Sequence, residues 1–193
     1  MIEHDTEELF ERAKMFATAA HEAIKHRRKY TLKPYIEHPI AVAMILRHWG
    51  CSWLEQAAAC LHDVIEDTGV TADTLRLFFP EVLVVMVEGL SDVSTPEDGG
   101  REIRKQIDRE HTWAQDEKTQ NVKLADCYHN SIDIGMYDRN FARVFIHEIL
   151  KLIDGMENAN PVLKQKVIDR LHELQAKLRN DRELEGLEKA LQK

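Results

Sequence analysis

The chain has 193 residues, of which 44% are hydrophobic and 31% are charged, a composition typical of a globular protein of about one domain. Its formal net charge of −8 argues against non-specific attraction to nucleic acid or to an anionic membrane surface. The three cysteines lack CxxC spacing, and no apolar run approaches the roughly 18 residues of a membrane span. We therefore expect a cytoplasmic protein that has neither nucleic acid nor a membrane as a partner.

Apolar residues recur at helical spacing along the sequence, and no run with the alternation of a strand stands out. The first helix is expected to follow a Thr6 cap and to reach about Ile24. Further helices are expected at about 39–49, 52–67, from Thr71, 81–90, 101–110, 116–134 and 140–156, with a last long one after Pro161. Breakers in residues 92–100 predict a loop. The predicted fold class is all-α, with residues 1–193 forming a single compact bundle.

The segment AAACLHDVIEDTGV, which ends at Val70, places the ionisable side chains of His62, Asp63, Glu66 and Asp67 in apolar surroundings. In a helix, residues three and four apart share a face, so these carboxylates repel each other unless a cation lies beside them. One interpretation is a solvated acidic helix end. The Ala-rich run before the histidine favours a buried helix, and hence a metal site. An imidazole beside a carboxylate suits Mn²⁺, Fe²⁺ or Mg²⁺ better than a thiolate-rich zinc site.

Two residues cannot hold such an ion, so further ligands must come from elsewhere in the chain. His38 in PYIEHPIAVAMIL lies at a predicted helix start with apolar residues on both sides. Asp126 in VKLADCYHN follows an apolar approach, where an unpaired carboxylate is costly. Either residue alone is compatible with a structural role. Together with His62 and Asp63 they make a set of two histidines and two aspartates, for which a metal site is the better interpretation.

These three segments resemble successive motifs of the HD-domain metal-dependent phosphohydrolases, and within them the RelA/SpoT-type alarmone hydrolases, which read approximately PYIxHPxxVAxIL, AALLHDVxEDT and VKLADRLHN. The string HDVIEDT is the most specific part. The resemblance covers roughly residues 10–175, so the remaining C-terminal segment is expected to be a helical extension. It implies a single HD-type hydrolase domain, similar to the stand-alone small alarmone hydrolases, including the animal type.

The resemblance also implies roles for particular residues. It assigns one Mn²⁺ per chain to His38, His62, Asp63 and Asp126, activation of the attacking water to Glu66 and Asp67, and substrate contacts to Tyr35 and Asn130. The implied reaction is hydrolysis of the alarmone (p)ppGpp at its 3′ position, which releases pyrophosphate and GDP or GTP. Cys127 and Tyr128 depart from the family, because Arg-Leu or Lys-Leu is common there and one basic group near the site is missing.

Two basic clusters stand out in this acidic chain, and both flank segments that are predicted to meet at the metal. The candidate phosphate contacts are Arg27, Arg28 and Lys29 in the first cluster, Arg101 and Arg104 in the second, and Arg143 after the Asp126 helix. Either cluster alone is compatible with a solvated face. A phosphate-rich ligand requires local positive charge, and guanidinium groups match phosphate oxygens in a bidentate way.

Several alternatives remain open from the sequence. The same site could serve (p)ppApp or the 2′-phosphate of NADPH, or belong to a non-catalytic HD module that senses a nucleotide. The sequence does not decide whether Glu66 or Asp67 accepts the proton, and a homo-oligomer is compatible with it.

Overall fold

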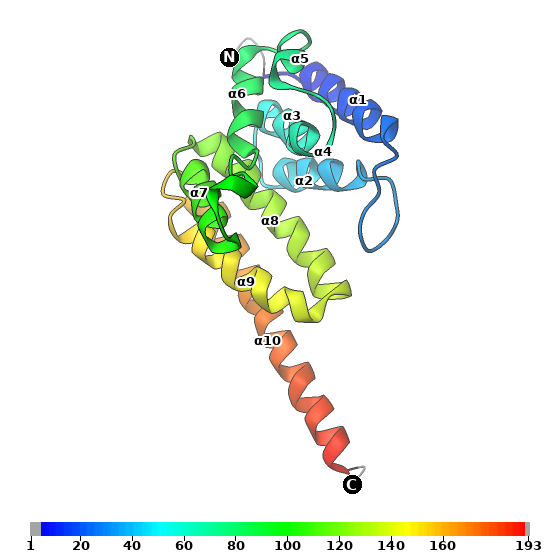
Figure 1. Ribbon diagram of the computed structural model, residues 1–193, viewed down its shortest axis with the longest axis vertical. Coiled ribbons are helices and arrows are strands. Elements are labelled where there is room, and N and C mark those ends of the chain that lie inside the picture. The colour runs from blue at the N-terminus through cyan, green and yellow to red at the C-terminus, as the bar shows by residue number, and fades with distance from the viewer. Residues whose placement is uncertain (1–4, 192–193) are drawn as a thin grey trace.

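The computed structural model describes the backbone of residues 5–191 and the side chains of residues 5–181. The helices are α1 (Glu7–Ala23), α2 (Glu37–His48), α3 (Trp53–Leu61), α4 (Val64–Asp67), α5 (Ala72–Arg76), α6 (Glu81–Leu90), the 3-10 turn η1 (Pro96–Asp98), α7 (Arg101–Trp113), α8 (Glu117–Tyr137), α9 (Arg139–Asp154) and α10 (Pro161–Leu191). Within this described part the β-type pairing is one isolated bridge between Arg27 and Pro34. The all-α prediction is therefore confirmed (Figure 1).

Three of the predicted helix starts are confirmed by side-chain caps. Thr6 accepts a hydrogen bond from the Leu9 N–H and begins α1. Ser52 begins α3 through a capping box with Glu55, in which each side chain accepts from the other residue's backbone N–H. Thr71 caps the short helix α5 in the same way as Thr6 caps α1. Each cap satisfies backbone N–H groups that have no partner inside the first turn, so these starts follow from local sequence.

The continuous helix predicted over 52–67 is wrong, because the chain breaks at the His62–Asp63 pair. Helix α3 ends at Leu61, and α4 begins at Val64 after Asp63 adopts φ −96° and ψ 0°. The Nδ1–H of His62 donates to the Ala59 carbonyl oxygen at 2.8 Å, so the side chain satisfies a carbonyl at the end of α3. The turn places His62 and Asp63 between two helices. Helix α2 begins at Glu37, slightly earlier than predicted, so His38 lies in its first turn.

Helix α8 joins two hydrophobic clusters. The first cluster is built mainly from α1, α2, α3 and α6, and it includes Val122 and Ala125 of α8. The second is built mainly from α9 and α10, and it includes Leu124 and Cys127 of α8. In Figure 1, α8 runs between these two groups of helices. Asp126 therefore lies where the two clusters meet, on a helix that is fixed from both sides.

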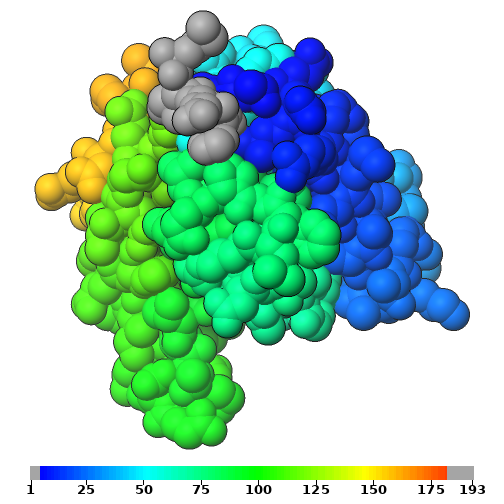
Figure 2. Space-filling view, turned by 90° about the horizontal axis from the view of Figure 1, so that it is seen from above, coloured from blue at the N-terminus to red at the C-terminus, as the bar shows by residue number. Residues whose placement is uncertain are grey.

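The remaining elements surround this arrangement. Helix α10 packs against α8 and α9, and it extends away from the rest of the molecule, at the end opposite α1, α5 and α6 (Figure 1). Seen from above, the segment around residues 70–90 lies between α1, drawn in blue, and the green chain that follows residue 100 (Figure 2). None of the helices in the described part is both long enough and apolar enough to cross a membrane.

Candidate active site

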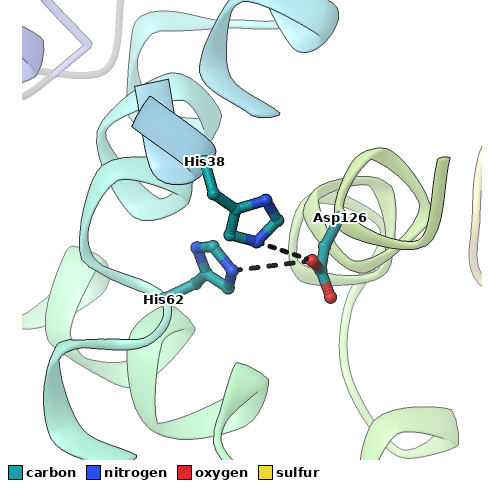
Figure 3. A group of neighbouring side chains, drawn as sticks. All are labelled: His38, His62 and Asp126. Atoms are coloured by element: carbon teal, nitrogen blue, oxygen red, sulfur yellow. Dashed lines mark ion pairs between the residues drawn. The ribbon is translucent and has the colours of Figure 1, made fainter. Parts of the chain in front are cut away.

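Three elements bring His38, His62 and Asp126 to one point (Figure 3). The Nε2 atom of His38 on α2 lies 3.1 Å from Oδ1 of Asp126 on α8. The Nε2 atom of His62, in the turn after α3, lies 3.7 Å from the same oxygen. One ligating atom from each of the three side chains lies within 4.8 Å of the other two, and all three residues are buried. Such a group can hold a metal ion.

Asp63 joins this group from the same turn. Its Oδ2 atom lies 3.0 Å from Nε2 of His62 and 3.7 Å from Nε2 of His38. The same oxygen accepts a hydrogen bond of 2.6 Å from the Tyr35 hydroxyl. The structure thus brings together all four residues that the sequence predicts as metal ligands, although His62 and Asp63 come from a turn and not from one helix face.

The protonation pattern of these side chains fits a divalent cation. A carbonyl oxygen can only accept, so the contact with Ala59 holds a proton on Nδ1 of His62, and in the neutral imidazole this leaves a lone pair on Nε2. This Nε2 is buried and has no hydrogen-bond partner of suitable geometry among the described residues, despite its closeness to Asp63. A lone pair that faces two carboxylates requires a positive charge between them. The donor set of two imidazoles and two carboxylates suits a borderline or hard divalent ion.

The electrostatics of the cluster point the same way. Burial alone opposes ionisation of Asp126, but the imidazoles of His38 and His62 hold its pKa well below its usual range. Burial likewise opposes a charge on His62, yet the carboxylates of Asp63 and Asp126 raise its pKa well above the ordinary value. The cluster thus favours a positive charge at its centre, and either a proton or a bound cation can supply it.

Glu66 and Asp67, the predicted water-activating pair, have different neighbours. Oε1 of Glu66 accepts the Asp92 N–H at 2.7 Å. Oδ2 of Asp67 lies 3.9 Å from Nδ1 of His26. Partial burial raises the pKa of both carboxyl groups above the ordinary range, which makes each a better proton acceptor near neutral pH.

Two pockets adjoin the cluster. The first, here called the carboxylate pocket, has a volume of about 450 Å³ and is lined by Asp63, Glu66 and Asp126 among others. The second, here called the arginine pocket, has a volume of about 280 Å³ and is lined by residues 26–30 together with Tyr35, Asn130, Asp133, Ile134 and Phe141. Asn130, Ile134 and Phe141 line both pockets. Glu66 belongs to the wall of the carboxylate pocket, beside two of the predicted metal ligands.

Three predicted substrate contacts lie beside the cluster. Arg28 donates to Oδ2 of Asp133 at 2.6 Å and to Oδ1 of Asn130 at 3.4 Å. Asn130 donates in turn to Oδ1 of Asp126 at 2.6 Å. The ring of Tyr35 stacks on His26 with the centroids 3.8 Å apart, while its hydroxyl contacts Asp63. These contacts link the loop before α2 to the predicted metal ligands.

The other predicted substrate contacts are placed less directly. Arg27 and Lys29 line the arginine pocket, and Arg27 pairs with Glu22 at 3.0 Å. Arg101 lines the carboxylate pocket but forms a bidentate contact with Glu148. Arg104 is not among the residues that line either pocket.

The structure does not bring Arg143 to the site. Arg143 lies on the exposed face of α9, in a separate hollow with Arg179 of α10. The sequence places it shortly after the Asp126 helix, but the direction of α9 turns it away from both pockets.

Sequence reasoning missed two residues of the site, Lys123 and His129. Lys123 lines the carboxylate pocket, and its spacing of three residues from Asp126 in VKLADCYHN could have identified it. Nδ1 of His129 lies 2.8 Å from Nδ1 of His38 and so holds that imidazole in place. Burial lowers the pKa of His129 to about 4. Cys127 also lines the carboxylate pocket, so the basic group that is missing from the motif would have lain there.

Comparisons with known proteins agree with this arrangement. The model of the HD domain family matches residues 13–130. Guanosine-3′,5′-bis(diphosphate) 3′-pyrophosphohydrolase MESH1 of Xenopus tropicalis is 31% identical over 160 residues, which cover 79% of this chain and 87% of that protein. The bifunctional (p)ppGpp synthase/hydrolase SpoT of Escherichia coli K12 is 30% identical over 152 residues, covering 76% of this chain but 21% of the longer protein.

A solved structure shares the fold. It is described as a metazoan ortholog of SpoT that hydrolyses ppGpp and plays a role in starvation responses. Its TM-score is 0.76 at 22% sequence identity, and the match covers 88% of this chain and 97% of that chain. The likeness in fold extends over most of both chains.

Proposed function

Since the chain belongs to the HD-domain family, we propose that it hydrolyses the 3′-diphosphate of (p)ppGpp, giving inorganic diphosphate and GDP or GTP. The observation that carries this proposal is the convergence of two histidines and two aspartates beside a pocket that also presents Glu66. Relatives that match most of this chain carry the name of that activity. The proposal also includes the domain organisation: residues 1–193 form a single HD-type hydrolase domain with a C-terminal helical extension.

The proposed cofactor is one Mn²⁺ per chain, held by His38, His62, Asp63 and Asp126. Their mixed nitrogen and oxygen donors support a borderline or hard divalent ion. When bound, such an ion acts as a Lewis acid that lowers the pKa of water and offsets phosphate charge.

The protein's own side chains perform the remaining steps of the proposed reaction. A water oxygen forms a bond to the inner phosphorus of the 3′-diphosphate, the bond from that phosphorus to the 3′ oxygen breaks, and the 3′ hydroxyl is regenerated with a proton. Glu66 is the favoured acceptor of the water's proton, because it lines the carboxylate pocket and its pKa is raised by partial burial. Asn130 and Arg28 orient the nucleoside side of the substrate, since Asn130 lines both pockets and Arg28, which lines the arginine pocket, donates to Asn130.

The alternatives from the sequence remain within reach of the same site. The adenosine alarmones differ in the base, and NADPH carries a 2′-phosphate in place of the 3′-diphosphate. A non-catalytic sensing module is disfavoured, because the predicted ligands and both carboxylates of the pair are present. The same proposal includes a small nucleotide as the substrate, a cytoplasmic location, and no nucleic-acid or membrane partner. A homo-oligomer is compatible with it.

A product analysis tests the proposal. The protein is incubated with Mn²⁺ and separately with guanosine 3′,5′-bis(diphosphate), its adenosine analogue and NADPH, and the products are separated by anion exchange. The expected result is GDP and inorganic diphosphate from the guanosine compound, at a rate well above that of the other two. Hydrolysis of NADPH alone, or tight nucleotide binding without any product, would contradict it. The Asp126→Asn variant, measured beside the wild type, controls for contaminating phosphatases.

A further inference from the structure

The wall of the carboxylate pocket contains four basic side chains, those of Arg101, Lys105, Arg109 and Lys123. Three of them already donate hydrogen bonds to carboxylates. Arg101 donates to Glu148 at 2.8 Å, Lys105 to Asp92 at 3.2 Å and Arg109 to Glu102 at 3.0 Å. These three cations are therefore satisfied within the protein.

Lys123 differs from its three basic neighbours. Its side chain is only 19% exposed, and its ammonium nitrogen lies 3.9 Å from Oδ2 of Asp126, which is beyond hydrogen-bond distance. Among the side chains that the structure describes, it donates no hydrogen bond. At neutral pH the lysine side chain is an ammonium. A largely buried ammonium with three unused N–H donors requires an acceptor, and the pocket is where that acceptor can enter.

The order of residues along one face of helix α8 indicates which part of the substrate supplies this acceptor. Lys123, Asp126, Asn130 and Ile134 follow each other at spacings of three and four residues, so they share one face of the helix. Lys123 and Asp126 line only the carboxylate pocket, whereas Asn130 and Ile134 line both pockets. At about 1.5 Å per residue, Lys123 lies roughly 4–5 Å along the axis from Asp126, on the side away from the arginine pocket. A group bound at Lys123 is thus beyond the reacting phosphorus, seen from the nucleoside.

From this placement we propose that Lys123 is a substrate contact that binds the outer phosphate of the 3′-diphosphate. This inference rests on the proposed function for the identity of the substrate. It adds which residue binds the outer phosphate and how the substrate is oriented in the site. The nucleoside lies towards the arginine pocket, the inner phosphate at Asp126, and the outer phosphate at Lys123. The phosphate oxygens supply the acceptors that the protein does not supply to this ammonium. Inorganic diphosphate, the expected product, would make the same contact.

Direct binding of the products tests the contact without relying on turnover. Titration calorimetry compares inorganic diphosphate and GDP on metal-loaded wild type and on the Lys123→Met variant. Loss of a charge-assisted hydrogen bond is expected to weaken diphosphate binding by about 10–100-fold, while the affinity for GDP and the metal content stay within about twofold. The Lys123→Arg variant keeps the charge and is expected to recover part of the diphosphate affinity.

Lys118→Met is the matched control, because Lys118 lies on the same helix but faces a different hollow, with Glu55 and Asn160. It removes the same charge and is expected to leave diphosphate affinity unchanged. Unchanged diphosphate affinity in Lys123→Met would overturn the proposal. Equal weakening of diphosphate and GDP binding would mean that Lys123 acts only through its general positive charge. Loss of metal would mean that Lys123 supports Asp126 in metal binding. Each outcome is readable even if the alarmone proves not to be the substrate.

Discussion

The histidine–aspartate cluster and the basic clusters around it differ in how firmly the protein holds them. His38, His62 and Asp126 are buried and come from three elements that pack against each other. Several of the basic side chains are exposed and pair with a nearby carboxylate, as Arg27 does with Glu22 and Arg101 with Glu148. Burial leaves a polar group few possible partners, whereas a surface arginine has many.

The energetic consequence is that the two regions respond differently to substitution. Exposed ion pairs contribute about 0–1 kcal/mol, so Arg27 and Arg101 can exchange a carboxylate for a phosphate at little cost. A buried group that loses its partner is left with an uncompensated polar atom, which costs about 1–3 kcal/mol or more. Arg28 is intermediate, because its side chain is 14% exposed in its pair with Asp133.

The largest effect is expected at Glu66 and Asp67. The double variant Glu66→Gln, Asp67→Asn should keep its fold and metal but lose about 10²–10⁴-fold in kcat, the usual range for removal of a general base. Because Glu66 lines the carboxylate pocket, Glu66→Gln alone should account for most of this loss, while its amide oxygen can still accept the Asp92 N–H. Steady-state kinetics of the two single variants measures the split. A larger loss in Asp67→Asn would move the proton acceptor to Asp67.

Removal of one predicted ligand should break the buried cluster. Asp63→Ala is expected to weaken metal affinity by more than about 100-fold, because even substitutions next to metal ligands commonly cost 10–100-fold. Metal content after dialysis, measured by mass spectrometry, checks this. Asp133→Ala serves as the control, since Asp133 pairs with Arg28 and takes no part in the cluster. Equal metal content in Asp63→Ala and the wild type would reject the assignment.

His21 tests the effect of burial at a histidine outside the predicted ligand set. Burial lowers its pKa to about 4, against about 6.5 in an unfolded chain. Between these values the unfolded chain binds a proton that the folded protein does not, so stability falls as the pH drops from about 6.5 to 4. The contribution lost between pH 7 and pH 5 is about 2 kcal/mol, and His21→Asn should remove it. Urea unfolding of both proteins at the two pH values measures the difference, and an identical pH dependence would contradict it.

The smallest effect is expected in the first basic cluster, where two adjacent arginines should differ. Arg28→Ala should raise KM for the alarmone about tenfold, because this guanidinium connects Asn130, Asp133 and the Tyr35 ring. Arg27→Ala should change KM by less than about twofold, since Arg27 is exposed and pairs with Glu22. Kinetics at one ionic strength compares them. Equal changes in KM would mean that net charge, and not contact, attracts the substrate.

Much of this protein could be predicted from the sequence because its signals are local. Helix caps such as Thr6 and Ser52 act within three residues, and helical spacing of apolar residues identifies the bundle. His38, His62, Asp63 and Asp126 stood out because polar side chains in apolar segments need a partner. Their shared role in a metal site could be predicted without knowing how the three segments pack together.

The tertiary structure decided what depends on contacts between distant segments. The break between α3 and α4 directs His62 and Asp63 to the same point, where a continuous helix would spread them around its axis. Glu66 is fixed by the backbone of Asp92, 26 positions away, while Asp67 faces His26. Whether a basic side chain is satisfied or left unpaired, as at Lys123, depends on which carboxylates the fold brings within reach. Local sequence carries no record of those neighbours.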